Sequence, residues 1–152
     1  MGTRYYCENQ KRRQLLRDAP LDLNGIDYLE VLDGDAPPGT EPQRTLLVRM
    51  LKSAPWGLGR DNVRIEGGVR IEGIQVEWAM RASAAPIDLV TPGIITAEES
   101  NQVLVVRTDS NGDYSSYTLR LVHSPTSAAP PAGFDPILSR VAFSFKVECP
   151  SG

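Results

Sequence analysis

The sequence predicts an all-β fold, an antiparallel β-sandwich preceded by a short N-terminal helical or irregular arm. The 13 glycines and 12 prolines make up about 16% of the 152 residues, against a usual share of about 12%, which argues against a helical bundle. From Leu21 onward, short apolar runs are separated by Gly, Pro, Asn and Asp, a sequence pattern typical of β-sandwiches and β-barrels. The clearest of these runs alternate apolar and polar side chains, the period of a half-buried strand.

The arm is expected over residues 1–20 and the β-sandwich domain over residues 21–152. Residues 8–17 are mostly good helix formers, but only Leu15 and Leu16 are apolar. A helix there is therefore short and largely solvated. Asp18-Ala19-Pro20 ends it, because proline cannot continue a helix.

About seven strands are expected, the number typical of an immunoglobulin-like sandwich. In the last of them, Val141, Phe143, Phe145 and Val147 share one face, which makes it the clearest core strand. The β-rich segments are residues 26–32, 44–52, 62–81, 102–108, 114–123 and 140–148.

Two irregularities predict local geometry. Between Ile65 and Ile74 the apolar positions change from odd to even numbers, so we expect a β-bulge near Gly73. Ser-Asn-Gly-Asp at 110–113 suits a hairpin turn between 102–108 and 114–123, because Asn and Gly tolerate positive φ.

The expected core takes its members from the alternating faces of these strands. It comprises Leu46, Val48, Ile74, Val76, Trp78, Leu119, Leu121, Val141, Phe143, Phe145 and Val147.

Composition excludes several classes of function. The formal charge of −3 removes the basic surface that nucleic-acid binding needs. The N-terminus is charged and no stretch approaches 18 apolar residues, so neither a signal peptide nor membrane insertion is expected. A single histidine excludes metal sites built on two imidazoles. Cys7 and Cys149 are too few and too far apart for a disulfide framework, and inert thiols in a reducing cytosol are favoured over metal ligands or a disulfide.

Short motifs do not add a catalytic or metal site. Asp109-x-Asn111-x-Asp113 resembles the start of a calcium loop, but Tyr114 stands where glycine is needed and Arg120 where the bidentate glutamate is needed. A turn is favoured there. Gly57-Leu58-Gly59 likewise indicates a plain turn rather than a phosphate loop, and His123 is favoured as a rim residue rather than a member of a catalytic triad.

Three acids are the remaining candidates for chemistry. Glu66, Glu72 and Glu77 could supply the carboxylate pair of a glycosidase. However, Glu66 and Glu72 share a predicted strand face with Arg64 and Arg70, and mixed charges on one face are typical of a solvated strand. We therefore expect no enzyme activity, metal or cofactor.

Partner contacts are expected at Tyr5, Tyr6, Arg12, Arg13 and Trp56. Tyrosine, arginine and tryptophan are the residue types that concentrate binding energy at protein interfaces, and Pro-rich loops lose less entropy than flexible ones when they become ordered. The segments expected to meet partners are 5–17, 33–41, 53–61 and 124–135.

Several blocks, spread in order along the chain, resemble the N-terminal part of the baseplate assembly proteins of phage-tail-like contractile injection systems. The opening Tyr6-Cys7 with Arg12-Arg13 fits the same pattern. The blocks are Leu23–Val31, Arg44–Val48, Asn62–Gly68 and Phe134–Pro136 leading to Phe143–Pro150.

The resemblance implies a structural component without catalytic residues, and a chain that is the N-terminal part of a longer protein. It implies assembly in a ring with wedge, hub and sheath-initiating proteins, in the bacterial cytoplasm, within a particle that can be released. The alternative from another class is a carbohydrate-binding or glycan-processing β-sandwich with Trp56 and the acids as its site. An exposed groove lined by Trp56 and two carboxylates would favour that alternative.

Overall fold

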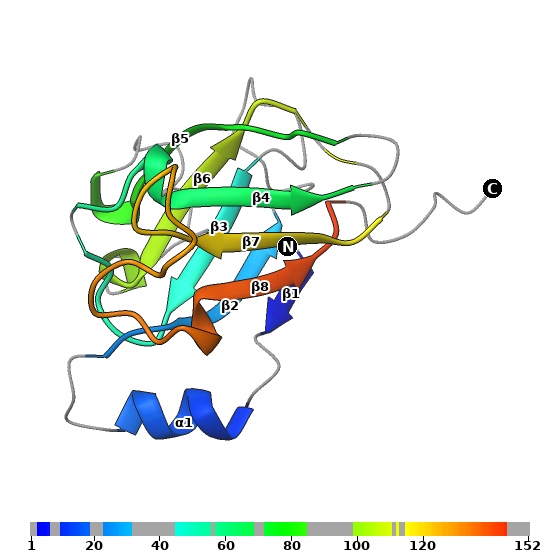
Figure 1. Ribbon diagram of the computed structural model, residues 1–152. Coiled ribbons are helices and arrows are strands. Elements are labelled where there is room, and N and C mark those ends of the chain that lie inside the picture. Colours follow the sequence, from blue (N-terminus) through cyan, green and yellow to red (C-terminus); the bar gives the residue numbers. More distant parts are fainter. Residues whose placement is uncertain are drawn as a thin grey trace.

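Two antiparallel β-sheets face each other, with one short helix beside them (Figure 1). The computed structural model describes residues 3–6, 10–18, 23–31, 45–55, 57–68, 72–84, 99–110, 112 and 115–145. The all-β sandwich with a short helical arm is confirmed. The described residues form eight strands, where about seven were expected.

The larger sheet has five strands in the order β1-β2-β3-β6-β5. All of its neighbouring strands are antiparallel. Its edges are therefore β1, at the N-terminus, and β5. The strands are β1 (Thr3–Tyr6), β2 (Ile26–Val31), β3 (Thr45–Met50), β5 (Val76–Arg81) and β6 (Val103–Thr108).

The smaller sheet has three strands in the order β4-β7-β8: β4 (Val63–Gly67), β7 (Tyr117–Leu121) and β8 (Arg140–Phe143). Strand β8 lies against β1 and β2 of the larger sheet, and β4 lies near β5. The core fills the space between the two sheets.

The segment 62–81 is two strands in different sheets, not one bulged strand. Strand β4 pairs with β7, whereas β5 pairs with β6. The chain therefore changes sheets between them, and Gly73, with a φ of 69°, lies in this connection. The expected bulge occurs further along, because the β5–β6 register shifts between Val76 and Trp78 and leaves Glu77 as the extra residue.

This bulge corrects the expected position of Trp78. Val76 and Ala79 face the main core, whereas Trp78 is half-buried and packs on the opposite face of the sheet. There it contacts a second cluster of Leu47, Ala82, Val103 and Val105. The Arg107 guanidinium lies 5.3 Å from the centre of its ring.

The predicted hairpin at 110–113 is wrong. Strand β6 pairs with β3 and β5, and β7 pairs with β4 and β8, so the chain crosses from one sheet to the other here. Gly112 is needed for a different reason, because a Cβ atom at this position would lie 2.8 Å from the Tyr117 ring and would also overlap Phe145. Asn111 and Asp113 lie outside the described residues.

Most of the predicted core is confirmed. Tyr117, Phe143 and Phe145 form an aromatic cluster with ring centroids 4.9 to 6.0 Å apart. Nine of the eleven expected members are buried, Trp78 is half-buried, and Val147 lies outside the described residues. The nine are Leu46, Val48, Ile74, Val76, Leu119, Leu121, Val141, Phe143 and Phe145.

Helix α1 (Gln10–Asp18) lies at one end of the sandwich, below both sheets in Figure 1. Its one buried residue is Leu16, as expected from a segment with two adjacent leucines and otherwise polar side chains. Strand β1, immediately before it, was not expected from the sequence. The arm is thus a strand and a helix that both contact the body.

Candidate partner-binding surface

The arm, residues 3–6 and 10–18, is held to the body by strand pairing, aromatic contacts and ion pairs. Strand β1 pairs with β2 from Thr3 opposite Val31 to Tyr6 opposite Tyr28. Tyr5 points inward, where its ring meets the Phe143 ring edge-on at 6.3 Å and its hydroxyl donates to the Ser144 carbonyl oxygen over 3.1 Å. Burial raises the pKa of the Tyr5 phenol, and the bond to Ser144 partly offsets that rise.

Tyr6, half exposed, forms the outer side of the same strand. Its ring lies 5.2 Å from the ring of Tyr28, and the Arg13 guanidinium lies 5.2 Å from its centre. Stacking of an arginine on an aromatic face is favourable. The contact between Arg13 and Tyr6 also joins α1 to β1, the two neighbouring elements of the arm.

Helix α1 makes a two-bond contact with the body through the pair between Arg12 and Asp135. Arg12 Nε donates to Asp135 Oδ2 over 2.7 Å, and Arg12 Nη2 donates to Oδ1 over 2.5 Å. The Asp135 side chain is fully buried, and its Oδ2 also accepts the Leu138 backbone N–H over 3.1 Å. The arginine bonds, followed by the backbone bonds, hold the pKa of Asp135 below its ordinary value despite desolvation.

Asp27 on β2 forms ion pairs with two further arginines of the helix. Arg13 Nη1 lies 2.5 Å and Arg17 Nη2 lies 2.9 Å from its Oδ1 atom. Asp27 and Arg13 are largely buried, with 14% and 12% of their side chains exposed. Such partly buried pairs are screened less by salt than pairs on the open surface.

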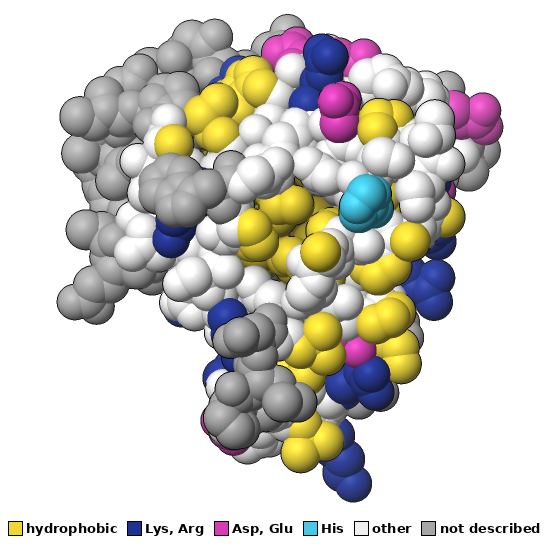
Figure 2. Space-filling model, turned by 60° about the vertical axis from the view of Figure 1, so that its left-hand side comes forward, with side chains coloured by type: hydrophobic (Ala, Val, Ile, Leu, Met, Phe, Trp, Pro, Cys, Tyr) yellow, Lys and Arg dark blue, Asp and Glu magenta, His cyan; other side chains and the backbone are white. Residues whose placement is uncertain are grey.

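Exposed large apolar side chains gather at this end of the molecule. Among the described residues they are Tyr6 on β1, Leu15 on α1 and Ile137 in the 3-10 turn that follows Asp135. Leu15 is 71% exposed on the helix face that points away from the body. Helix α1 carries Lys11, Arg12, Arg13 and Arg17 against Asp18, and Lys and Arg side chains show in dark blue at the lower end of Figure 2.

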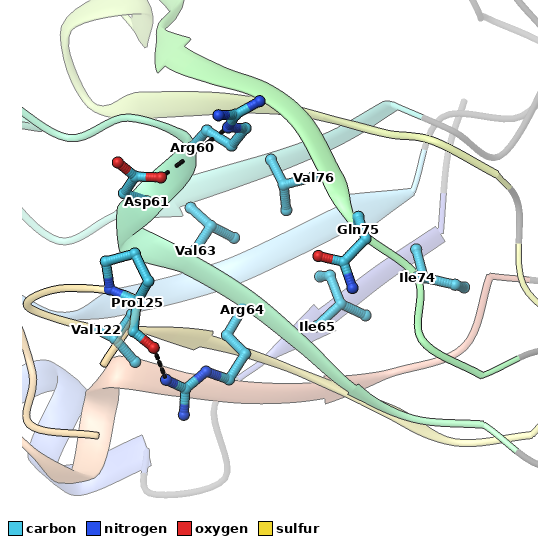
Figure 3. A pocket seen from close by; sticks show the side chains of 10 residues that line it. All are labelled: Arg60, Asp61, Val63, Arg64, Ile65, Ile74, Gln75, Val76, Val122 and Pro125. Atoms are coloured by element: carbon cyan, nitrogen blue, oxygen red, sulfur yellow. Dashed lines mark hydrogen bonds and ion pairs between the residues drawn. The ribbon is translucent and has the colours of Figure 1, made fainter. Parts of the chain in front are cut away.

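A groove of about 490 Å³ opens at another place, between β4 and the chain that leads into β5 (Figure 3). Val63, Ile65, Ile74, Val76 and Val122 contribute its apolar walls, and Arg60 and Arg64 lie at its rim. Asp61 is the one carboxylate among its described lining residues.

The groove therefore offers no carboxylate pair from the described residues. Glu66 lies beside Arg64 and Arg120 at 3.8 and 3.7 Å, which fits the expected solvated face. Glu72 and Glu77 are exposed. His123 is exposed as expected, and Figure 2 shows it at the rim of a hydrophobic patch.

The described parts of the chain bring no three potential metal ligands of the His, Cys, Asp and Glu types together. Asp109 Oδ1 accepts the backbone N–H of Gln75, a residue 34 positions earlier in the chain, over 3.1 Å. Within the same residues, no helix has the length and apolar character needed to cross a membrane.

Four of the five predicted contact residues, Tyr5, Tyr6, Arg12 and Arg13, lie together in the docked arm. All four contact the chain's own body, so their role toward a partner stays a prediction. Trp56 lies outside the described residues, as do Cys7 and Cys149. Sequence reasoning missed Asp27 and Asp135, whose arginine partners Arg13 and Arg12 stand 14 and 123 positions away, because no local pattern marks either aspartate.

Comparison with curated proteins and with solved structures found no match. Residues 1–143 match the family described as phage baseplate assembly protein, N-terminal domain. This match covers the docked arm and all eight strands, and it gives the chain a structural role in a phage baseplate, among other baseplate proteins of a tail-like particle. The chain belongs to the N-terminal domain family of phage baseplate assembly proteins.

Proposed function

We propose that the chain is a wedge component of the baseplate of a contractile, phage-tail-like injection system, and that it works by binding rather than by catalysis. The family match over residues 1–143 carries this proposal. Its partners are neighbouring wedge, hub and sheath-initiating proteins arranged in a ring. Assembly takes place in the bacterial cytoplasm, and this domain is the N-terminal part of a longer wedge protein.

The arm end of the molecule is the surface that we assign to partner contact. Leu15 and Ile137 are 71% and 50% exposed there. Arginines lie on the same helix as Leu15, and arginine is among the residue types that concentrate binding energy at interfaces. Neither side chain appears in the hydrogen bonds or ion pairs that dock the arm, so each can be changed without opening it.

Substitution of both apolar residues by glutamine tests the proposal. Leu15→Gln with Ile137→Gln, in the phage-tail-like particle's own producer strain, should abolish or sharply reduce assembled baseplates counted by negative-stain microscopy. Glutamine is chosen because its helix propensity is close to that of leucine. Ala84→Gln, at an exposed position just beyond edge strand β5, is the matched control and should leave the particles normal.

The free energy of unfolding should be the same in the variant and the wild-type protein, within about 0.5 kcal/mol, as for ordinary surface substitutions. Normal particle numbers from the double variant would contradict the assignment of this surface. Absence of the wild-type chain from purified particles would contradict the wedge role itself.

A further inference from the structure

Three arginines lie in a row across the outer face of the smaller sheet. Arg64 on β4 is the Cα partner of Arg120 on β7, and Arg120 is in turn the partner of Arg140 on β8. Leu119 and Val141, each next to one of these arginines in the sequence, belong to the core. Because side chains alternate along a strand, the arginines point away from the core. We call these three residues the arginine row.

The arginine row is a charge arrangement that folding alone does not favour. Like charges directly opposite each other on neighbouring strands are destabilising, and Arg120 has an arginine on each side. The three strands contain one acid, Glu66, which lies 3.8 Å from Arg64 and 3.7 Å from Arg120. With three arginines and one glutamate, they carry a formal charge of +2 on a chain whose net charge is −3. Natural proteins depart from such local rules mainly at functional sites.

A hollow of about 150 Å³ opens beside Arg120 and Arg140, and Ser139 and Pro136 form part of its wall. This volume exceeds the share of roughly 30 Å³ that a water molecule takes up, so it leaves room for a carboxylate group. Guanidinium groups bind carboxylates through two parallel hydrogen bonds. Ile137, which is 50% exposed at the arm end, directly follows Pro136. The hollow therefore lies next to the surface that we assign to partner contact.

Arg64 extends the row to the rim of the groove between β4 and the chain that leads into β5. Its Nη2 atom donates to the Pro125 carbonyl oxygen over 3.0 Å (Figure 3). This bond and the nearby Glu66 carboxylate hold the half-buried side chain in place. A side chain that is ordered before binding loses less conformational freedom when a partner arrives.

We propose that the arginine row binds an acidic segment of a neighbouring baseplate protein, and that one carboxylate of this segment enters the hollow beside Arg120 and Arg140. The inference rests on the proposed function only in taking the partner to be a baseplate protein. Separated carboxylates suit this face better than nucleic acid does. Glu66, in contact with the row, would repel a continuous line of phosphates, and complementary charges across an interface fix the register of a protein partner.

Peptide binding to the purified protein tests the charge chemistry without particle assembly. The probe is a blocked Gly-Glu-Gly-Glu-Gly-Glu peptide, and the same peptide with glutamine in place of glutamate is its control. Isothermal titration should show binding of the glutamate peptide alone, with an affinity that falls as salt is added. Arg120→Gln with Arg140→Gln should weaken this binding by about tenfold or more, because hydrogen bonds to charged groups are lost.

The matched control is Arg81→Gln, which removes the same charge from β5 of the larger sheet and should leave the affinity unchanged. Failure of the glutamate peptide to bind, equal binding of the glutamine peptide, or an equal loss from Arg81→Gln would overturn the proposal.

Urea unfolding separates a binding role from a structural one. Because Arg120 has a like charge on each side, the double variant should keep the unfolding midpoint of the wild-type protein or exceed it. A loss of affinity accompanied by a lower midpoint would mean that these arginines support the fold, which contradicts the proposal.

Photo-cross-linking in purified particles identifies the partner. Ala142 is exposed on the face of the arginine row, two residues beyond Arg140. p-Benzoylphenylalanine placed at Ala142 should join to another baseplate protein, within a segment that carries Asp or Glu, as mapped by mass spectrometry. The same label at Ala84, beyond β5, is the control and should not give this product.

A cross-link from position 142 to nucleic acid or to a segment without acidic residues, or no cross-link to any protein, would overturn the arginine row as a docking surface. The wedge role is judged separately, by the presence of the wild-type chain in the same particles.

Discussion

Asp135 shows how much one side chain does at the arm end. It accepts two bonds from Arg12 and one from the Leu138 backbone, its own N–H donates to the Asn24 carbonyl, and its carbonyl accepts the Ser139 hydroxyl. One residue therefore ties helix α1, the start of β2 and the turn before β8. Removing one partner of a buried, hydrogen-bonded ion pair is strongly destabilising, because it leaves an uncompensated charge.

The stability contributed by Asp135 should depend on pH. Its folded-state pKa lies below the ordinary value of 3.8, so its contribution is fully present above that value and is lost as the pH falls through the folded pKa. Asp135→Asn should lower the free energy of unfolding at pH 7, and the difference from the wild type should disappear in strong acid. Urea titrations at the two pH values measure this. A difference that stays constant with pH would contradict it.

Phe143 is the second residue with a definite expected cost. It is 2% exposed and contacts the rings of Tyr5, Tyr117 and Phe145. Phe143→Ala should destabilise the domain by about 3 to 5 kcal/mol, the usual range for emptying such a site. Chemical denaturation measures the change. A loss below about 1 kcal/mol would mean that the aromatic cluster does not hold the sheets together.

At the scale of elements, the two adjacent leucines of α1 differ in burial: Leu16 is buried against the body and Leu15 is exposed. Leu16→Ala should lower the free energy of unfolding by about 2 kcal/mol, the lower end for a buried leucine, because Leu16 is the buried apolar side chain of α1. Hydrogen exchange should then speed up over residues 10–18 while β3 and β6 stay protected, since peripheral elements open locally. Leu15→Ala, at the exposed neighbour, is the control and should leave exchange unchanged. Equal effects from the two variants would contradict the docking of α1.

Strands were predictable where one face is buried. The alternation of Val141 and Phe143 marks β8 correctly, because period 2 is a property of a single strand. The pairing of β6 with β3 and β5 rather than with β7 was not predictable from the 110–113 turn. The sequence of that segment is compatible with a hairpin, whereas the partners of β6 are the distant strands β3 and β5, which no local pattern identifies.

Sequence reasoning singled out residues of the arm by their type, but not the geometry in which they lie, and their role toward a partner stays a prediction. Tyr5, Tyr6, Arg12 and Arg13 were identified because such residues are enriched at interfaces. Their positions on the body depend on Asp27, Asp135 and Ser144, which are ordinary polar residues in the sequence. Long-range pairing of this kind becomes visible only when the chain is folded.

At the scale of the whole molecule, five strands face three, and the chain changes sheets repeatedly rather than completing one sheet before the other. The smaller sheet needs β4, β7 and β8 together, so it cannot close until residues near 143 are available. Folds dominated by such distant pairings form slowly, because the chain loses the entropy of loop closure before the compensating strand contacts form.

The contact between Tyr5 and Ser144 has a mechanical consequence. It places the N-terminal strand beside the point where the chain leaves β8. A pull applied at these two ends would enter the sandwich at neighbouring points, each on an edge strand. Such a force would separate β1 from β2, or β8 from β7, before it separated β3 from β6. The strands at the centre of the larger sheet would therefore stay paired.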